Sequence, residues 1–136
     1  MYEDFEGGIP GTFINLDNDG LTDNYGFGNW SFGDLGPTGD NEALSSSWIT
    51  NGDFTADDWL VTPALLLPVD QKLYWNAIAS DAAYPDGYEV LISTTGTAIP
   101  GDFGTTLFSI AAENSTETSR NADLSAYAGQ TVYIAF

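Results

Sequence analysis

Short apolar stretches separated by turn residues constrain the fold of this chain more than any other feature of its sequence. The clearest stretches are residues 73–78 and 88–93, and in the second of these Tyr88, Val90 and Ile92 share one face. Alternation with a period of two is typical of a β-strand that buries one side, whereas helical periodicity is hard to find. The pattern predicts an all-β chain that folds as a sandwich or a barrel.

Further stretches rich in β-branched and aromatic residues predict seven more strands, bounded by clusters of Gly, Pro, Asn and Asp. A chain of 136 residues with 43% apolar residues is long enough to bury a core. We therefore expect one domain over residues 1–136. The additional predicted strands are 2–6, 13–16, 46–49, 59–62, 106–110, 120–123 and 131–136.

The charge balance is extreme, because 20 Asp and Glu residues face only Lys72 and Arg120, and the formal net charge is −18. Most carboxylates must therefore be hydrated, screened by salt or bound to metal ions. Calcium prefers oxygen ligands and is the expected cofactor. The same charge repels phosphate backbones and anionic headgroups, so we expect neither nucleic-acid binding nor membrane insertion.

An acidic cluster near the amino terminus is the first candidate metal site. Asp4 and Glu6 precede the segment Asp17-Asn18-Asp19-Gly20, and Asp23 follows it. Carboxylates around a glycine turn can converge on one calcium ion while backbone carbonyls fill the remaining positions. The spacing is not that of an EF-hand, and a solvated Asp-Gly turn is the alternative interpretation.

A second set of aspartates lies in loops beside predicted strands. Loop aspartates commonly bond their own backbone, so we favour a turn-forming role for this set over metal binding. Its members are Asp53, Asp57, Asp58, Asp81 and Asp86.

Enzymatic functions find little support in the composition. The chain has no histidine and no cysteine, which excludes a Ser-His-Asp triad and a cysteine nucleophile. Paired carboxylates could hydrolyse glycosides, but nothing in the sequence selects two of the acidic residues for that task. We expect a non-enzymatic protein.

Three aromatic residues in predicted loops are candidate ligand contacts. Tyr25, Trp30 and Tyr84 could stack on the apolar faces of pyranose rings, because aromatic faces suit such surfaces. The alternative for any aromatic residue is burial in the core, and it is favoured for those within strands, such as Trp75 and Tyr88.

Several segments, in this order, resemble the cleaved-adhesin and choice-of-anchor J domains of bacterial surface proteins, which are related in fold to the MAM-type jelly roll. The resemblance spans almost the whole chain. Its segments are EDFEGGIP (3–10), LDNDG (16–20), DWLVTPAL (58–65), LYW (73–75), YPDGYEVLIST (84–94) and DLSAYAGQ (123–130) leading into VYIAF (132–136).

The resemblance implies a two-sheet antiparallel β-sandwich of the jelly-roll type. It also implies a secreted or cell-surface bacterial protein in which the domain serves as an adhesin or accessory module and is often stabilised by calcium. Its expected partners are a host or cell-surface protein or a glycan. Glu6, Asp17 and Asp19 match the acidic positions near the amino terminus of such domains and are the first choice of ligands.

One departure from the pattern concerns the last strand. Domains that this chain resembles continue past the VYIAF strand with a further strand, so we expect a jelly roll that lacks its final strand. The stretch from Thr131 to Phe136 is uncharged and free of proline, and we expect it to form an open edge. An alternative function follows, in which the chain forms a homopolymeric extracellular filament through strand donation by a neighbouring subunit.

Overall fold

The computed structural model describes residues 1–34, 39–49, 52–53, 55–69 and 71–136, with the side chains of 52 and 53 excepted. The chain forms two compact units, residues 1–60 and 61–136. In the described residues nearly all regular structure is antiparallel β-strand, and one 3-10 turn spans Ser125–Tyr127. The all-β prediction is confirmed.

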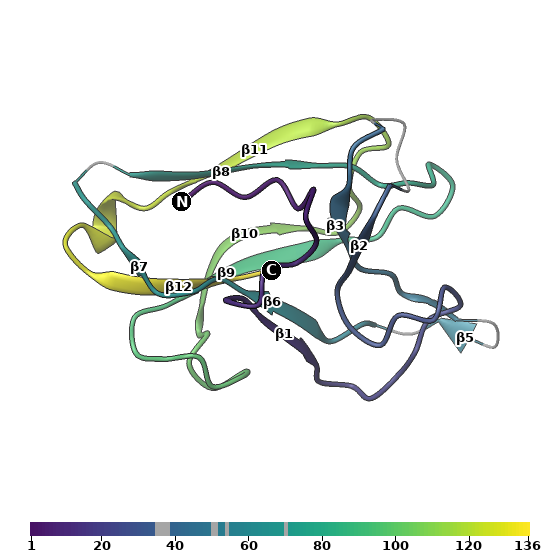
Figure 1. Ribbon diagram of the computed structural model, residues 1–136, viewed down its shortest axis with the longest axis horizontal. Coiled ribbons are helices and arrows are strands. Elements are labelled where there is room, and N and C mark those ends of the chain that lie inside the picture. The colour runs from purple at the N-terminus through teal and green to yellow at the C-terminus, as the bar shows by residue number, and fades with distance from the viewer. Residues whose placement is uncertain (35–38, 50–51, 54, 70) are drawn as a thin grey trace. The chain divides into compact units, whose positions relative to one another are not determined.

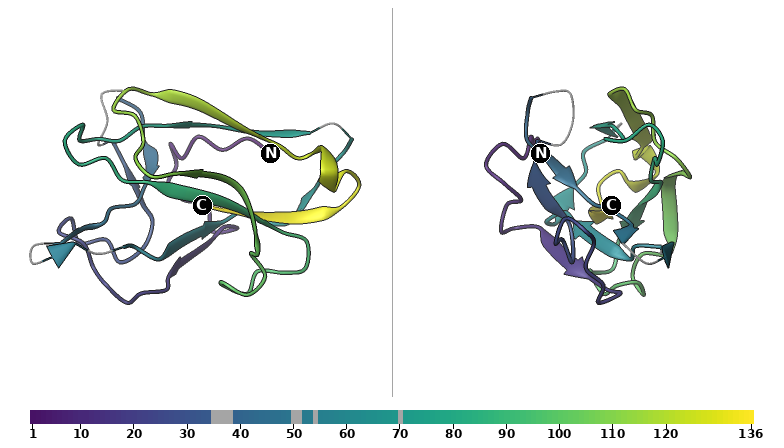
Figure 2. Two further views of the ribbon diagram at one scale, coloured as in Figure 1. Left: turned by 180° about the vertical axis from the view of Figure 1, so that it is seen from behind. Right: turned by 90° about the vertical axis from the view of Figure 1, so that its right-hand side faces the viewer.

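The second unit holds two β-sheets (Figure 1). In the larger, β9 (Tyr88–Ser93) lies between β10 (Thr105–Ile110) and β12 (Thr131–Ala135), and β7 (Leu65–Leu66) pairs with β12. In the smaller, β8 (Lys72–Ala77) pairs with β11 (Thr118–Asp123) in an unbroken antiparallel register. Figure 2 shows from behind that the pair β8–β11 forms a layer of its own.

The two sheets of this unit enclose a hydrophobic core. The side chain of Trp75 on β8 points inward and meets Phe108 of β10 edge to face, with ring centroids 5.2 Å apart. Burial of this apolar surface, rather than strand propensity alone, holds the sheets together. The fully or nearly buried members of the core are Leu67, Val90, Ile92, Leu124, Val132 and Ile134.

The expectation that Thr131 to Phe136 forms an open edge is wrong. The first two residues of β12 pair with β7, and Ala135 pairs with Val61. On the other side β12 pairs with β9, so it is an interior strand of the sheet. Val132 and Ile134 are completely buried, which explains why the strand carries no charge. The premise of a filament built through this strand is therefore removed.

The first unit contains shorter strands. β1 (Ile14–Asp17) neighbours β6 (Asp58–Val61), whose last residue belongs to the second unit. β2 (Ser31–Gly33) pairs with β3 (Glu42–Leu44), and β4 (Trp48–Ile49) pairs with β5 (Gly52–Asp53).

The predicted strand at residues 2–6 does not form. Glu3 Oε1 accepts a hydrogen bond from the backbone N–H of Phe5, and Asp4 Oδ1 accepts one from Glu6 N–H. Phe5 has a positive φ of 58°, which no β-strand allows. Acidic side chains that bond nearby backbone compete with strand pairing, and here they form a turn.

Candidate metal centre

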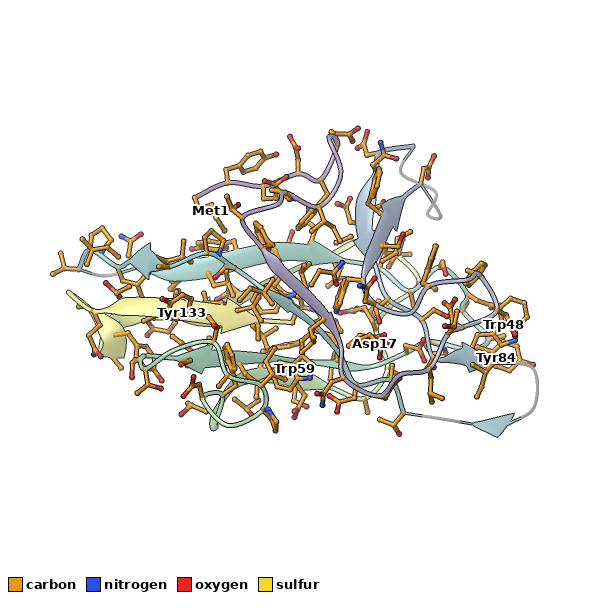
Figure 3. The ribbon with its side chains drawn as sticks, turned by 60° about the horizontal axis from the view of Figure 1, so that its bottom comes forward. Met1, Asp17, Trp48, Trp59, Tyr84 and Tyr133 are labelled. Carbon is orange, nitrogen blue, oxygen red and sulfur yellow. The ribbon has the colours of Figure 1, made fainter. Side chains whose placement is uncertain are left out.

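The candidate site begins at the turn that follows β1. The carboxylate of Asp17, which lies at the end of that strand (Figure 3), accepts a hydrogen bond from Gly20 N–H. Asp19 Oδ1 accepts one from Leu21 N–H at 2.7 Å, and Gly20 takes a φ of +72°, a conformation that favours glycine. The turn therefore fixes both carboxylates on the same side of the chain.

Residues before β6 are tied to this turn by a series of hydrogen bonds. Asn18 N–H donates to the carbonyl of Asp57 at 3.0 Å, and the Asn18 side-chain amide donates to Asp57 Oδ2 at 2.7 Å. In return, Asp57 N–H donates to Asp19 Oδ2 at 2.8 Å. The next residue, Asp58, is thereby brought beside the turn.

Three carboxylates converge as a result. Asp17, Asp19 and Asp58 each offer an oxygen, and these oxygens lie within 4.8 Å of one another. Each of the three side chains is half-buried. Carboxylates at this separation repel one another unless protons or a cation intervene.

The electrostatics of Asp58 reflect this crowding. Burial, followed by the charges of Asp19, Asp17, Asp23 and Asp57, raises the pKa of Asp58 from 3.8 to about 6. Its Oδ1 is buried and has no hydrogen-bond partner among the described residues. In the described part of the chain, no hydrogen bond to Asp58 Oδ1 offsets this negative charge.

The surroundings offer further oxygen atoms. A Cβ built on Gly28 would lie 3.5 Å from Asp17 Oδ2, from the carbonyl oxygen of Leu21 and from the hydroxyl of Thr22. The backbone at Gly28 therefore passes close to three oxygen atoms of different kinds. An all-oxygen donor set of carboxylate, carbonyl and hydroxyl groups suits calcium.

Asp23 is the most buried of the predicted ligands, with 7% of its surface exposed. Its Oδ1 accepts hydrogen bonds from Tyr25 N–H and Phe27 N–H at 3.0 and 2.8 Å, while its Oδ2 has no partner among the described residues. The first oxygen thus holds the loop 23–27, and the second adds to the field at Asp58.

Two of the predicted ligands lie in other contacts. Asp4 Oδ1 accepts the Glu6 N–H within the amino-terminal turn, and the two oxygens of Glu6 accept hydrogen bonds from the backbone and side chain of Asn41. Among the described residues the convergent group consists of Asp17, Asp19 and Asp58. The structure thus unites two predicted ligands with one residue that the sequence had suggested as a turn former.

The other members of the second aspartate set behave as turn or anchoring residues. Asp81 Oδ1 accepts a hydrogen bond from Ala83 N–H, and Asp57 Oδ1 accepts one from the Trp59 indole N–H. The backbone carbonyl of Asp86 accepts a hydrogen bond from Glu113 N–H. The side chain of Asp53 lies outside the described part of the chain.

The aromatic candidates differ in setting. Tyr25 is half exposed and stacks on Phe27 at 5.8 Å, and it meets Trp48 edge to face at 5.3 Å. The indole N–H of Trp30 donates to the carbonyl of Asp58, so this residue supports the acidic cluster. Tyr84 is strongly exposed in a loop. Trp48, which the sequence places in the predicted strand 46–49 where burial is the usual expectation, is exposed as well.

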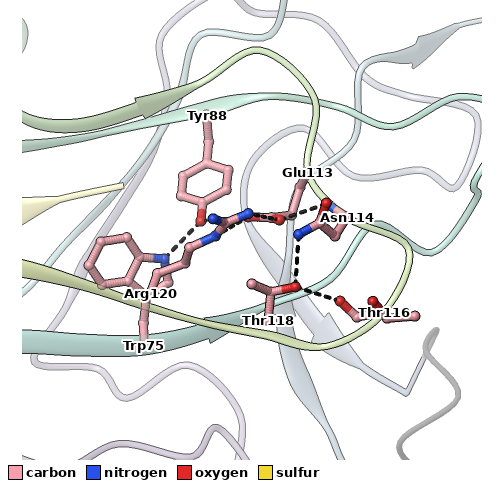
Figure 4. A network of polar contacts seen from close by, with 7 residues as sticks. All are labelled: Trp75, Tyr88, Glu113, Asn114, Thr116, Thr118 and Arg120. Atoms are coloured by element: carbon pink, nitrogen blue, oxygen red, sulfur yellow. Dashed lines mark hydrogen bonds and ion pairs between the residues drawn. The ribbon is translucent and has the colours of Figure 1, made fainter.

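A buried ion pair occurs in the second unit (Figure 4). Arg120 Nη2 lies 2.6 Å from Glu113 Oε1, and the Tyr88 hydroxyl donates to Glu113 Oε2 at 3.0 Å while accepting the indole N–H of Trp75. Despite the burial of Glu113, which acts in the opposite direction, its hydrogen bonds, above all that from Arg120, lower its pKa. This network links β8, β9 and β11, which carry Trp75, Tyr88 and Arg120.

Comparison with known proteins identifies the family. The model of the Cleaved Adhesin Domain matches residues 1–135. The chain belongs to this family. Its fold agrees, since it aligns with the K3 and K1 cleaved adhesin domains of Lys-gingipain from Porphyromonas gingivalis with a TM-score of 0.73 in each case. The identities are 25% and 27%, and the alignments cover 98% of this chain and 86% and 84% of those domains.

Curated relatives of this cleaved adhesin domain are far longer proteins. The chain is 33% identical to Hemagglutinin A of Porphyromonas gingivalis over 121 residues, and 38% identical to Gingipain R1 of the same organism over 99 residues. These matches take in 73% and 71% of this chain but only 4% and 6% of the relatives. Among the described residues, no helix is long and apolar enough to span a bilayer.

Proposed function

We propose that this cleaved adhesin domain is a non-enzymatic, calcium-stabilised adhesion module of a secreted or surface-displayed bacterial protein. The adhesive role is supported by the family and by relatives that include a protein named Hemagglutinin A. The calcium role is carried by one observation, the convergence of the Asp17, Asp19 and Asp58 carboxylates.

Calcium would be held by these three carboxylates. The ion would supply the positive charge that the protein itself does not bring to Asp58. Because binding would join the turn after β1 to the start of β6, it would stabilise the first unit against local unfolding.

For the contact surface, we propose the aromatic cluster formed by Tyr25, Phe27 and Trp48. Exposed Tyr and Trp side chains provide large contact area at a low cost in side-chain entropy. The loop that presents Tyr25 is held by the buried Asp23, so the cluster is ordered before a partner arrives.

Thermal melts in calcium, in magnesium and in a chelator test the metal part of the proposal. A free calcium concentration one hundred times the dissociation constant should raise the unfolding free energy by about 2.7 kcal/mol, because only the folded chain binds the ion. Magnesium should have a smaller effect, since it dehydrates reluctantly. Equal melting temperatures in calcium and in chelator would refute the calcium site.

Binding of the fluorescently labelled chain to erythrocytes tests the adhesive part. Binding above that of an unrelated acidic protein is expected, together with its loss on Trp48→Ala. Absence of binding in calcium-containing buffer would count against adhesion to cells, independently of the melting result.

A further inference from the structure

The outward face of the β8–β11 sheet carries an ordered strip of side chains, all exposed to solvent. Because successive side chains of a strand point to opposite faces, these residues alternate with the inward ones that pack in the core. We call this face the outer strip. It consists of Lys72, Tyr74 and Asn76 on β8 and Ser119, Asn121 and Asp123 on β11.

The register places these side chains in three facing rows. Tyr74 stands opposite Asn121, with Asn76 opposite Ser119 on one side of this pair. Side chains in such rows have Cβ atoms about 5 Å apart. Tyr74 has 71% of its surface exposed, so most of its ring is accessible to a ligand.

Hydrogen bonds orient the polar part of the strip. The Asn76 amide donates to Glu117 Oε1 at 2.8 Å, and Asn76 Oδ1 accepts a hydrogen bond from Ser119 Oγ at 2.8 Å. One amide hydrogen and one oxygen lone pair of Asn76 remain available. The Asn121 side chain forms no hydrogen bond with any described residue, so its donor and acceptor are both available.

The inward faces of the same strands are rigid. Trp75 and Arg120, which face each other across the sheet, are tied to Tyr88 and Glu113 in the buried network of Figure 4. Tyr74 and Asn121 are the sequence neighbours of these two anchored residues. The outer strip is therefore preorganised, which lowers the entropic cost of binding.

We infer that the outer strip binds a neutral glycan chain lying along the strands. The Tyr74 ring would stack on the apolar face of one pyranose, and the amides of Asn121 and Asn76 would exchange hydrogen bonds with sugar hydroxyls. From Lys72 to Asn76 the strip extends about 13 Å, enough for a short run of linked sugars.

The composition of the strip favours a glycan over a protein partner. Protein hot spots are well-packed clusters that become fully desolvated, whereas here a single aromatic ring is surrounded by amide, hydroxyl and charged groups. The net charge of −18 disfavours anionic glycans, since it repels carboxylate and sulfate groups. The inference rests on the proposed adhesion function and adds to it a second binding site, distinct from the cluster of Tyr25, Phe27 and Trp48, with a ligand class of its own.

Affinity gel electrophoresis tests the inference, with galactomannan, xyloglucan, yeast mannan or mixed-linkage glucan included in the native gel. We expect at least one of these to retard the chain, whereas polygalacturonate does not. Tyr74→Ala should weaken that interaction at least about tenfold, and Tyr74→Phe should largely restore it because the phenyl ring still stacks. Asn121→Ala should weaken it by a smaller factor.

Tyr2→Ala is the matched control, because Tyr2 is also strongly exposed and lies outside the strip. Tyr74 points to solvent, so Tyr74→Ala should keep the melting temperature of the parent chain. Lack of retardation by all four neutral polysaccharides would overturn the inference, as would equal losses in Tyr74→Ala and Tyr2→Ala. If the chain adheres to cells but none of the four polysaccharides retards it, the proposed adhesion function stands and only the inference about glycan binding by the outer strip fails.

Discussion

Replacing Asp58 by asparagine should have opposite effects on stability in the absence and in the presence of calcium. Without the metal, Asp58 is a half-buried carboxylate, and its burial together with the negative charges of four nearby aspartates raises its pKa from 3.8 to about 6. The ionised form is therefore less favourable in the folded chain than in the unfolded chain. An asparagine side chain has nearly the same size as the aspartate and removes that charge.

The magnitude follows from the pKa. A rise from 3.8 to about 6 corresponds to about 3 kcal/mol against the ionised form if the full difference is expressed at neutral pH. Solvent reaches this side chain, and screening reduces the figure to about 1 kcal/mol. In chelator at pH 7.5, Asp58→Asn should therefore raise the melting temperature by about 4 °C.

In saturating calcium the sign should reverse, because the variant has lost one of three convergent carboxylate ligands. The calcium-induced rise in melting temperature should fall to less than half of that of the parent chain. Glu89→Gln serves as control, since Glu89 is an exposed carboxylate on β9 and its removal changes the net charge equally. It should leave the calcium response intact.

The dependence on pH gives an independent check. A folded-state pKa above the unfolded value means that Asp58 takes up a proton in the folded chain first, so the contribution of this residue to the stability of the calcium-free parent rises as the pH falls from about 7 towards 4. The difference between the parent and Asp58→Asn should shrink over that interval. A variant that is less stable than the parent in chelator at pH 7.5 would refute the reasoning about crowded charge.

Two further substitutions test the second unit by urea unfolding. Gly87→Ala should cost at least about 2 kcal/mol, because its Cβ would overlap the Ile110 carbonyl oxygen, whereas Gly101→Ala has nothing within 4 Å and should be neutral. Arg120→Met should lower the unfolding free energy at pH 7, because the buried Glu113 carboxylate loses its cation and keeps, among the described residues, only the hydrogen bonds from the Tyr88 hydroxyl and the Asn114 N–H. That loss should diminish as the pH falls through the lowered pKa of Glu113, since stability from this carboxylate exists only where it is ionised.

Strands with strong alternation were predictable from the sequence. Residues 88–93 form β9 with the predicted bounds, and residues 73–78 correspond to β8 within one residue. The hairpin β2–β3 was not predicted, because its strands have three residues each and carry glycine and acidic side chains that alternate weakly. Strands this short are specified by their pairing more than by their composition.

Two of the three carboxylates of the candidate metal site were predictable from the sequence, and the third was not. Asp17 and Asp19 lie in one turn, and their local pattern of alternating acids around glycine indicates calcium. Asp58 lies about forty residues further on and reaches them only because β6 neighbours β1. A single sequence does not reveal which strands pair, so a ligand contributed by a distant strand is hard to distinguish from a turn-forming aspartate.

The interior position of β12 shows how the same sequence signal can support opposite conclusions. An uncharged stretch of high β propensity promotes intermolecular pairing when it lies at the edge of a sheet. A continuous apolar run is also what a strand buried on both faces requires. Pairing with β7 and β9 decides in favour of burial. The relevant signal was the absence of any charged residue that would have protected an edge.

The distribution of charge links the fold to the proposed use of calcium. Both basic side chains belong to β8 and β11 of the second unit, where Arg120 pairs with Glu113 and Lys72 stands opposite Asp123. The charges that raise the pKa of Asp58 come from four aspartates, Asp19, Asp17, Asp23 and Asp57. Three carboxylates lie within 4.8 Å of one another in a chain that has few cations. Their repulsion lowers the stability of the folded state unless a metal ion offsets it. The stability of the first unit should therefore depend on calcium, while that of the second unit should not.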